Sequence, residues 1–185
     1  MFERRALRLR RSSLVRSPRG DGRPVLILPG LNGGDHAGHE LRTILDELGH
    51  TTHSWGLGVN DNRPGILDEV EAVVLGFDEP VALVGISLGG VYARRIARRH
   101  PDRVRFVATL GSPHQRPFGR TPDRELPPTG VETLCVVARF DQYVEAEATT
   151  IIGDPDVDVV RVVGGHCGLE YHPVVIRLLA ERLAG

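Results

Sequence analysis

The chain of 185 residues contains no lysine, so all 23 of its basic residues are arginine. It has only two cysteines, Cys135 and Cys167, which are too few for a disulfide-stapled scaffold. No apolar run approaches the roughly 18 residues that a membrane-spanning helix needs. Charged residues make up 25% of the chain and hydrophobic residues 41%, a balance that excludes disordered and coiled-coil chains. The length then predicts one domain with a buried core.

The first 20 residues form an arginine-rich segment that we expect to be an arm outside the domain of residues 21–185. The arm holds seven arginines and a single acid, Glu3, and it has no continuous apolar stretch typical of a secretory signal. We therefore expect a cytoplasmic protein. A basic arm can contact nucleic acid or an acidic membrane surface. Residues 21–185 are mildly acidic, with 16 arginines against 23 acids, so we expect no nucleic-acid partner, and nothing further supports membrane contact.

Short apolar runs alternate with segments of helical spacing along the whole domain. Runs that are apolar on both faces and alternate with helices predict a mostly parallel sheet of about six strands, with helices on both faces. The expected strands are Val25–Leu28, Thr51–Trp55, Val81–Ile86, Val104–Leu110, Leu134–Ala138 and Val157–Val163. The expected helices are His39–Leu48, Ile66–Phe77, Leu88–His100 with its arginines Arg94, Arg95, Arg98 and Arg99 on the outer face, a short piece after Tyr143, and Pro173–Leu183.

One long loop interrupts this alternation. Residues Ser112–Gly130 hold five of the 13 prolines, and loops of this length are usually functional. The loop is too short for a helical cap domain, although it could form a flap. We therefore predict a minimal domain with an exposed cleft.

A serine lies on the sharp turn between the third expected strand and the following helix. Gly85-Ile86-Ser87-Leu88-Gly89 has the G-x-S-x-G pattern, and its place between a strand and a helix is what gives the pattern weight. A serine there has a strained backbone and neighbours that crowd the strand and the helix, which requires glycine at positions 85 and 89. The alternative is a plain strand–helix turn with a capping serine. We favour Ser87 as a nucleophile.

A serine nucleophile needs a base, and the base needs an acid to orient it. His166 follows the last expected strand and a Gly-Gly turn, at the sheet edge where ligands bind in open parallel sheets. His172 ranks second, and we expect most of the other histidines to be surface or capping residues. Asp141 follows the fifth expected strand at the same edge. Three further acids, Asp154, Asp156 and Asp158, precede the last strand at the opposite edge and are predicted to be turn or capping residues.

Acyl transfer also needs donors that stabilise the oxyanion. The backbone amide of Leu88, directly after the serine, is one candidate. The loop of residues 28–34 follows the first strand, and we expect the Leu31 amide to be the second donor, with the Asn32 side chain as an additional one. The alternative is a glycine-rich connector. Neither the P-loop nor the dinucleotide-binding glycine pattern is present, and we expect no cofactor and no metal.

At these residues the sequence resembles the α/β-hydrolase superfamily, and more narrowly the small lipase- and esterase-like serine hydrolases common in actinobacteria. The matching pieces, within residues 22–184, are Pro29-Gly30-Leu31, residues 55–58, residues 85–94, residues 110–113, Asp141 and residues 165–169. The resemblance implies an α/β-hydrolase fold, with Ser87 as nucleophile, Asp141 as acid, His166 as base, and the Leu31 and Leu88 amides as oxyanion donors. The chain departs from its relatives after the acid, where Gln142 and Glu145-Ala146 replace the usual Gly and Pro-Trp.

Three functions stay open at this point. The first is a serine hydrolase that cleaves small-molecule carboxylic or lipid esters through an acyl-enzyme. The second is an acyltransferase or thioesterase with the same triad. The third is a non-catalytic binding protein that kept the fold. We also expect Cys135 and Cys167 to be unpaired, because the chain has no secretory signal.

Overall fold

The computed structural model describes residues 17–114 and 127–185, which fold into a six-stranded parallel sheet with helices on both faces. The strand order is β2-β1-β3-β4-β5-β6, and every neighbouring pair is parallel. The strands are β1 Pro24–Leu28, β2 Thr51–Ser54, β3 Val81–Ile86, β4 Val104–Leu110, β5 Thr133–Ala138 and β6 Val157–Val162. The helices are α2 His39–Glu47, α3 Ile66–Leu75, α4 Leu88–Arg99, α5 Ala146–Thr149, η1 His166–Tyr171 (a 3-10 helix) and α6 Pro173–Leu183.

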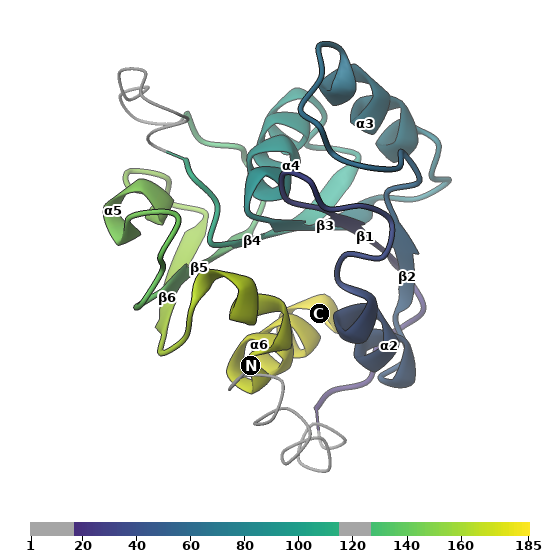
Figure 1. Ribbon diagram of the computed structural model, residues 1–185. Coiled ribbons are helices and arrows are strands. Elements are labelled where there is room, and N and C mark those ends of the chain that lie inside the picture. The colour runs from purple at the N-terminus through teal and green to yellow at the C-terminus, as the bar shows by residue number, and fades with distance from the viewer. Residues whose placement is uncertain (1–16, 115–126) are drawn as a thin grey trace.

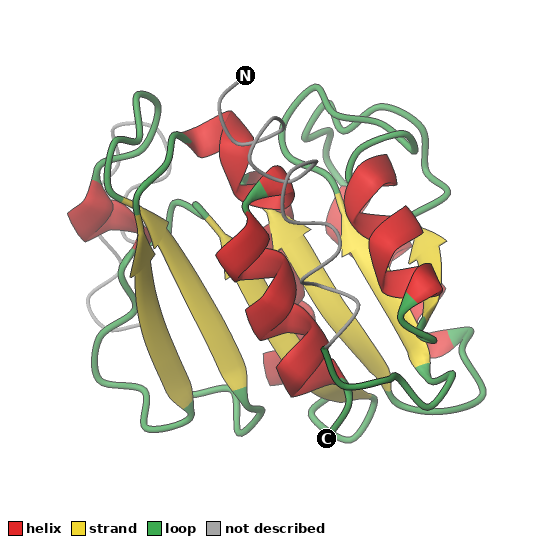
Figure 2. Cartoon of the chain, turned by 90° about the horizontal axis from the view of Figure 1, so that it is seen from below, coloured by secondary structure: helices red, strands yellow, loops and turns green. Residues whose placement is uncertain are grey.

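The helices cover the sheet as two layers (Figure 1). Helices α2 and α6 pack on one face, where Ile27, Val84 and Val136 meet the apolar sides of both helices. Helices α3 and α4 cover the opposite face, over Leu26 and Leu83. Figure 2 shows α2 and α6 in front of the sheet, with the strands running the same way. The carboxyl ends of the six strands therefore meet at one edge, and the loops at that edge can share a site.

The predicted fold class is confirmed, and so is the predicted succession of strands and helices along the chain. The strands β1, β3, β4 and β5 are buried along nearly their whole length, because each is covered by helices on both sides. The edge strands β2 and β6 are only partly buried. The 3-10 helix η1, which begins directly after the predicted Gly164-Gly165 turn, was not predicted. Among the described residues no cap domain is present.

One expectation about a polar residue was wrong. Arg94 does not lie on the outer face of α4: it is only 4% exposed, and its Nη2 forms an ion pair with Asp154 Oδ2 at 2.9 Å. Asp154 also accepts a turn hydrogen bond from the Asp156 amide, as predicted for a turn acid. Of the six histidines expected to be mostly surface or capping residues, four are exposed or partly exposed, while His50 and His114 are buried, at 4% and 5% exposure. The burial of each of these polar side chains is set by tertiary contacts and not by the spacing of residues along its own segment.

Two predicted segments lie wholly or partly outside the described residues. The arm of residues 1–20 is described only from Ser17 onward, where Arg19 Nη1 donates to the Glu47 carbonyl at 2.6 Å and the Gly20 amide to the Leu48 carbonyl at 2.8 Å. The predicted flap of Ser112–Gly130 falls largely on residues 115–126, also outside the described part. Within residues 17–114 and 127–185, no helix has the length and apolar character that crossing a bilayer requires.

Candidate active site

The site lies at the carboxyl edge of the sheet and begins at Ser87, in the turn between β3 and α4. Ser87 has φ 51° and ψ −120°, a left-handed backbone that side-chain-bearing residues rarely adopt. Its amide donates to the Leu110 carbonyl at the end of β4, at 2.8 Å, which anchors the turn to the sheet. This is the strained strand–turn–helix geometry that exposes a serine hydroxyl above a parallel sheet.

The two glycines of the motif are required because the backbone passes so close to its neighbours. A Cβ on Gly85 would lie 2.2 Å from the Gly90 nitrogen, and a Cβ on Gly89 would lie 2.2 Å from the Leu28 carbonyl oxygen. Both distances are shorter than any real carbon contact, and both obstacles are backbone that cannot move aside. The predicted need for glycine at positions 85 and 89 is therefore confirmed. The missing side chains at these two positions allow α4 to pack closely against β1 and β3.

His166 and Asp141 come together as a hydrogen-bonded pair at the same edge. His166 Nδ1 lies 2.6 Å from Asp141 Oδ2, and the two side chains are 11% and 2% exposed. The other carboxylate oxygen, Oδ1, accepts from the backbone amides of Tyr143 at 2.9 Å and Val144 at 2.8 Å. The loop after β5 thus orients the acid, while the start of η1 presents the imidazole.

The chemistry of this pair fixes the histidine tautomer. A carboxylate can only accept hydrogen bonds, so the Nδ1 of His166 must donate and carry the proton. The Nε2 atom of the neutral ring is then the one with a free lone pair, and it can take a proton from another group. The ring of Tyr143 lies beside His166 in a tilted contact, with ring centroids 5.4 Å apart.

Ser87 and His166 both lie beside the same short stretch of backbone, Leu110-Gly111. Leu110 holds the Ser87 amide, and the next residue, Gly111, lies directly under the imidazole: a Cβ there would be 3.0 Å from His166 Nδ1. Among the described residues, no hydrogen bond joins the Ser87 hydroxyl to His166. Such bonds are often long in unliganded sites and tighten when substrate binds. Both residues therefore lie beside the end of β4, and the hydrogen-bonded part of the site is His166 with Asp141.

The loop after β1 passes over the serine, as expected for a loop that supplies an oxyanion donor. A Cβ on Gly30 would lie 3.0 Å from the Ser87 Cβ. In the described part of the chain, the Leu31 amide has no backbone partner, and the Leu88 amide is one of the first N–H groups of α4, which have none within a helix. Asn32 has φ 61° and an exposed side chain, and its amide is already bound to the Asn60 carbonyl at 2.7 Å.

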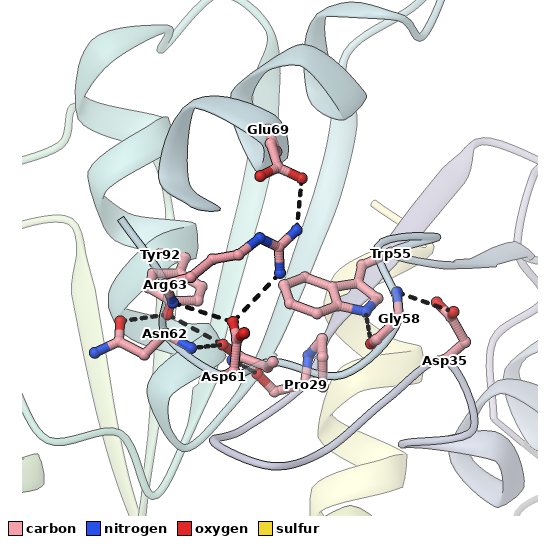
Figure 3. Close-up of polar contacts among 10 residues, drawn as sticks. Pro29, Asp35, Trp55, Gly58, Asp61, Asn62, Arg63, Glu69 and Tyr92 are labelled. Atoms are coloured by element: carbon pink, nitrogen blue, oxygen red, sulfur yellow. Dashed lines mark hydrogen bonds and ion pairs between the residues drawn. The ribbon is translucent and has the colours of Figure 1, made fainter. Parts of the chain in front are cut away.

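Sequence reasoning missed the residues that hold this loop. Asn60 is completely buried, and its side-chain Nδ2 donates to the Pro29 carbonyl at 2.8 Å. Asp35 accepts from the amides of Gly56 at 2.7 Å and Gly58 at 3.2 Å, which ties the end of the loop to the segment after β2 (Figure 3). The only feature of the sequence that marked this position was the run Asn60-Asp61-Asn62. Such a run is typical of an ordinary turn, and the residues that Asn60 contacts are far away in the sequence.

The remaining candidates take structural places. His172 caps α6, where its Nδ1 accepts from the Val174 amide at 3.3 Å. Asp158 pairs with Arg182 at 2.5 Å on the surface. Cys135 is buried and Cys167 exposed, and neither forms a disulfide, as expected. No group of three or more His, Cys, Asp or Glu side chains in the described ranges is arranged to hold a metal ion.

Comparison with known proteins gives one curated relative and many solved structures. No family model matches the chain. A pimeloyl-(acyl-carrier protein) methyl ester esterase of Shewanella woodyi is 32% identical over 103 residues, which span 55% of this chain and only 40% of that esterase.

Solved structures match over almost the whole chain. A candidate non-heme bromoperoxidase, BpoC of Mycobacterium tuberculosis H37Rv, aligns with a TM-score of 0.68 at 14% identity, over 89% of this chain and 92% of that one. A monoacylglycerol lipase of Paleococcus ferrophilus aligns with a TM-score of 0.64 at 14% identity, over 89% and 96%. The type II thioesterase BorB from the borrelidin biosynthetic cluster aligns with a TM-score of 0.63 at 18% identity, over 91% and 94%.

These likenesses, together with the sheet and the strained serine turn, show that the chain has the α/β-hydrolase fold. At such low identities they establish the fold alone, because unrelated activities share it. The lipase-like subgroup within the superfamily stays a prediction.

Proposed function

We propose that the protein is a serine hydrolase that cleaves carboxylic esters through an acyl-enzyme on Ser87. The observation that carries this proposal is the meeting, at one sheet edge, of a left-handed serine turn with a buried histidine–aspartate pair held at 2.6 Å. A plain structural turn has no need of a strained serine, and a structural histidine has no need of a carboxylate oriented by two backbone amides.

The residues take the following roles in this mechanism. His166 Nε2 accepts the Ser87 hydroxyl proton as the serine oxygen attacks the ester carbonyl, and Asp141 stabilises the imidazolium that forms. The Leu88 and Leu31 amides donate to the oxyanion of the tetrahedral intermediate. His166 then returns the proton to the leaving alcohol oxygen, which leaves an acyl-serine. Water attacks the acyl group in the same way, releases the carboxylic acid and restores the Ser87 hydroxyl.

Apolar side chains around the site support an uncharged, apolar ester as substrate. Leu31, Phe140 and Tyr143 are 41%, 62% and 72% exposed, and they flank the oxyanion loop and the acid. Large apolar groups exposed beside a site commonly serve as contacts for apolar ligands. The curated relative, named for a methyl ester, and the lipase among the similar structures support the same substrate class.

A thioester is the second candidate substrate, supported by the resemblance to the thioesterase BorB. The same nucleophile, base and oxyanion donors would attack either bond. Transfer of the acyl group to an alcohol or amine in place of water would also use the same residues.

The proposal is tested by hydrolysis of p-nitrophenyl esters of increasing chain length, of a simple methyl ester and of an acyl thioester, with wild-type protein and with Ser87→Ala. We expect ester turnover by the wild type and a loss of at least about a thousandfold in Ser87→Ala. Faster release in the presence of an added alcohol or amine, with a transfer product, would identify an acyltransferase. Wild-type protein that turns over none of these substrates would favour a binding protein and contradict the proposal.

A further inference from the structure

We propose that Asn60 is a positioning residue that holds the Leu31 amide in place over Ser87. The inference rests on the proposed function, since it concerns the oxyanion donor of that mechanism. Asn60 lies in the segment between β2 and α3 and has no exposed surface. Every hydrogen-bonding group that it has, in the backbone and in the side chain, is engaged.

The backbone of Asn60 forms a short ladder with the loop after β1. Its amide donates to the Gly33 carbonyl at 2.7 Å, and its carbonyl accepts from the Asn32 amide at 2.7 Å. Both contacts lie on the carboxyl side of Leu31. They fix the half of the loop that leaves the site.

The Asn60 side chain holds the other half of the loop. Its Nδ2 donates to the Pro29 carbonyl at 2.8 Å, and its Oδ1 accepts from the Asn62 amide and from the Tyr92 hydroxyl, both at 3.2 Å. A carbonyl can only accept, so the orientation of the amide group is set by its partner. Figure 3 shows Pro29, Asn62 and Tyr92 of this network; the single hydroxyl proton of Tyr92 is shared between Asn60 Oδ1 and Asn62 Oδ1, which lies nearer, at 2.8 Å.

Leu31 is thus bracketed on both sides by groups that Asn60 binds. Tyr92 belongs to α4, the helix that begins directly after Ser87, so Asn60 joins the oxyanion loop to the element that carries the nucleophile. Asp35 also pins this loop, but its contacts with Gly56 and Gly58 lie beyond Gly34 and leave the Leu31 segment to Asn60. Removing the Asn60 side chain would leave the Pro29 carbonyl without its partner and would free the Leu31 peptide to turn away.

The test compares Asn60→Ala with a matched control, Asn62→Gly. The control also removes a hydrogen bond to Tyr92, and glycine accepts the φ of 54° at position 62. The Asn62 side chain forms no hydrogen bond with the described loop of residues 29–34. Because loss of an oxyanion donor costs about a hundredfold to a thousandfold in kcat, we expect Asn60→Ala to lower kcat for a p-nitrophenyl ester about tenfold to a hundredfold. We expect KM to change by less than about threefold, since the loss falls on the transition state. Asn62→Gly should stay within about threefold of the wild type in both parameters.

Amide hydrogen exchange measured by NMR separates this inference from the proposed function. The Gly33 amide donates to the Gly30 carbonyl at 3.0 Å, next to the Pro29 carbonyl that the Asn60 side chain holds. This amide should exchange slowly in the wild type and much faster in Asn60→Ala. Should Asn60→Ala fail to fold, Asn60→Asp serves instead, because it keeps the side-chain shape and the Tyr92 acceptor while losing the donor to Pro29. A wild type without esterase activity contradicts the proposed function, and the exchange data still report whether Asn60 holds the loop. A folded variant with unchanged kcat, or with unchanged exchange at Gly33, overturns the inference.

Discussion

Burial of His114 predicts that acid destabilises the protein through a single histidine. The side chain is almost fully enclosed near Arg94, and its Nε2 has no hydrogen-bond partner among the described residues. Burial, reinforced by the positive charge of Arg94, lowers the pKa of His114 to about 3. The ordinary value for an unfolded chain is about 6.5. The unfolded state therefore binds a proton below that pH, whereas the folded state does not.

The magnitude follows from this difference. Above pH 6.5 the two states are both neutral at His114, and the residue adds no pH dependence. As the pH falls below 6.5, proton binding favours the unfolded state by up to about 1.4 kcal/mol for each pH unit, until the folded pKa is reached. We therefore expect His114 to remove about 1.4 kcal/mol of the free energy of unfolding between pH 7.5 and pH 5.5. Burial lowers the pKa of His50 as well, which acts in the same direction.

Urea unfolding at pH 7.5, 6.5 and 5.5 measures this effect in the wild type and in His114→Gln. Between pH 7.5 and pH 5.5 the free energy of unfolding of the variant should fall by about 1.4 kcal/mol less than that of the wild type. The contribution of His50 is common to both proteins and cancels. His39→Gln, at an exposed histidine, is the matched control and should keep the wild-type slope. Equal pH slopes for His114→Gln and the wild type would refute the assignment of a neutral, buried His114.

Three further outcomes are expected. Arg94→Met should lower the free energy of unfolding, measured in urea, by about 3–5 kcal/mol, because it leaves the buried Asp154 carboxylate unpaired. Adding Asp154→Leu should recover most of that loss. Equal stability of Arg94→Met and the wild type would contradict the buried pair. Gly85→Ala should lower the melting temperature or prevent folding, since its Cβ would meet the Gly90 nitrogen at 2.2 Å, and normal melting would contradict that packing. Asp141→Asn should stay folded but lower kcat by about 10⁴, as expected for loss of the orienting carboxylate, and full activity would exclude Asp141 as the acid.

The sheet was predictable because its central strands are buried on both faces. β3 and β5 consist almost wholly of apolar residues, and such runs between glycine, proline and polar turns have few other structural explanations. The strained serine turn was equally predictable, since the motif, the strand before it and the helix after it lie within one short segment. The same holds for His166 and Asp141, because each lies in the loop that follows a strand at the shared edge.

The polar residues that the prediction placed wrongly or missed depend on contacts far away in the sequence. Arg94 has the spacing of its exposed neighbours on α4, and only Asp154, 60 residues away, accounts for its burial. Asn60 reads as part of a turn, and its role appears only when the loop after β1 and the helix α4 are placed beside it. Local pattern identifies elements and strand-end residues, whereas the partner of a buried polar group is set by the tertiary fold.

The central claim is that Ser87 is a nucleophile activated by His166. A fluorophosphonate probe, followed by mass spectrometry of the digested protein, tests this claim most directly, because the probe reacts covalently only with an activated serine. We predict one probe adduct, on Ser87, that disappears in Ser87→Ala and forms far more slowly in His166→Ala. Wild-type protein that takes up no probe, or that carries the adduct on another residue, would contradict the account.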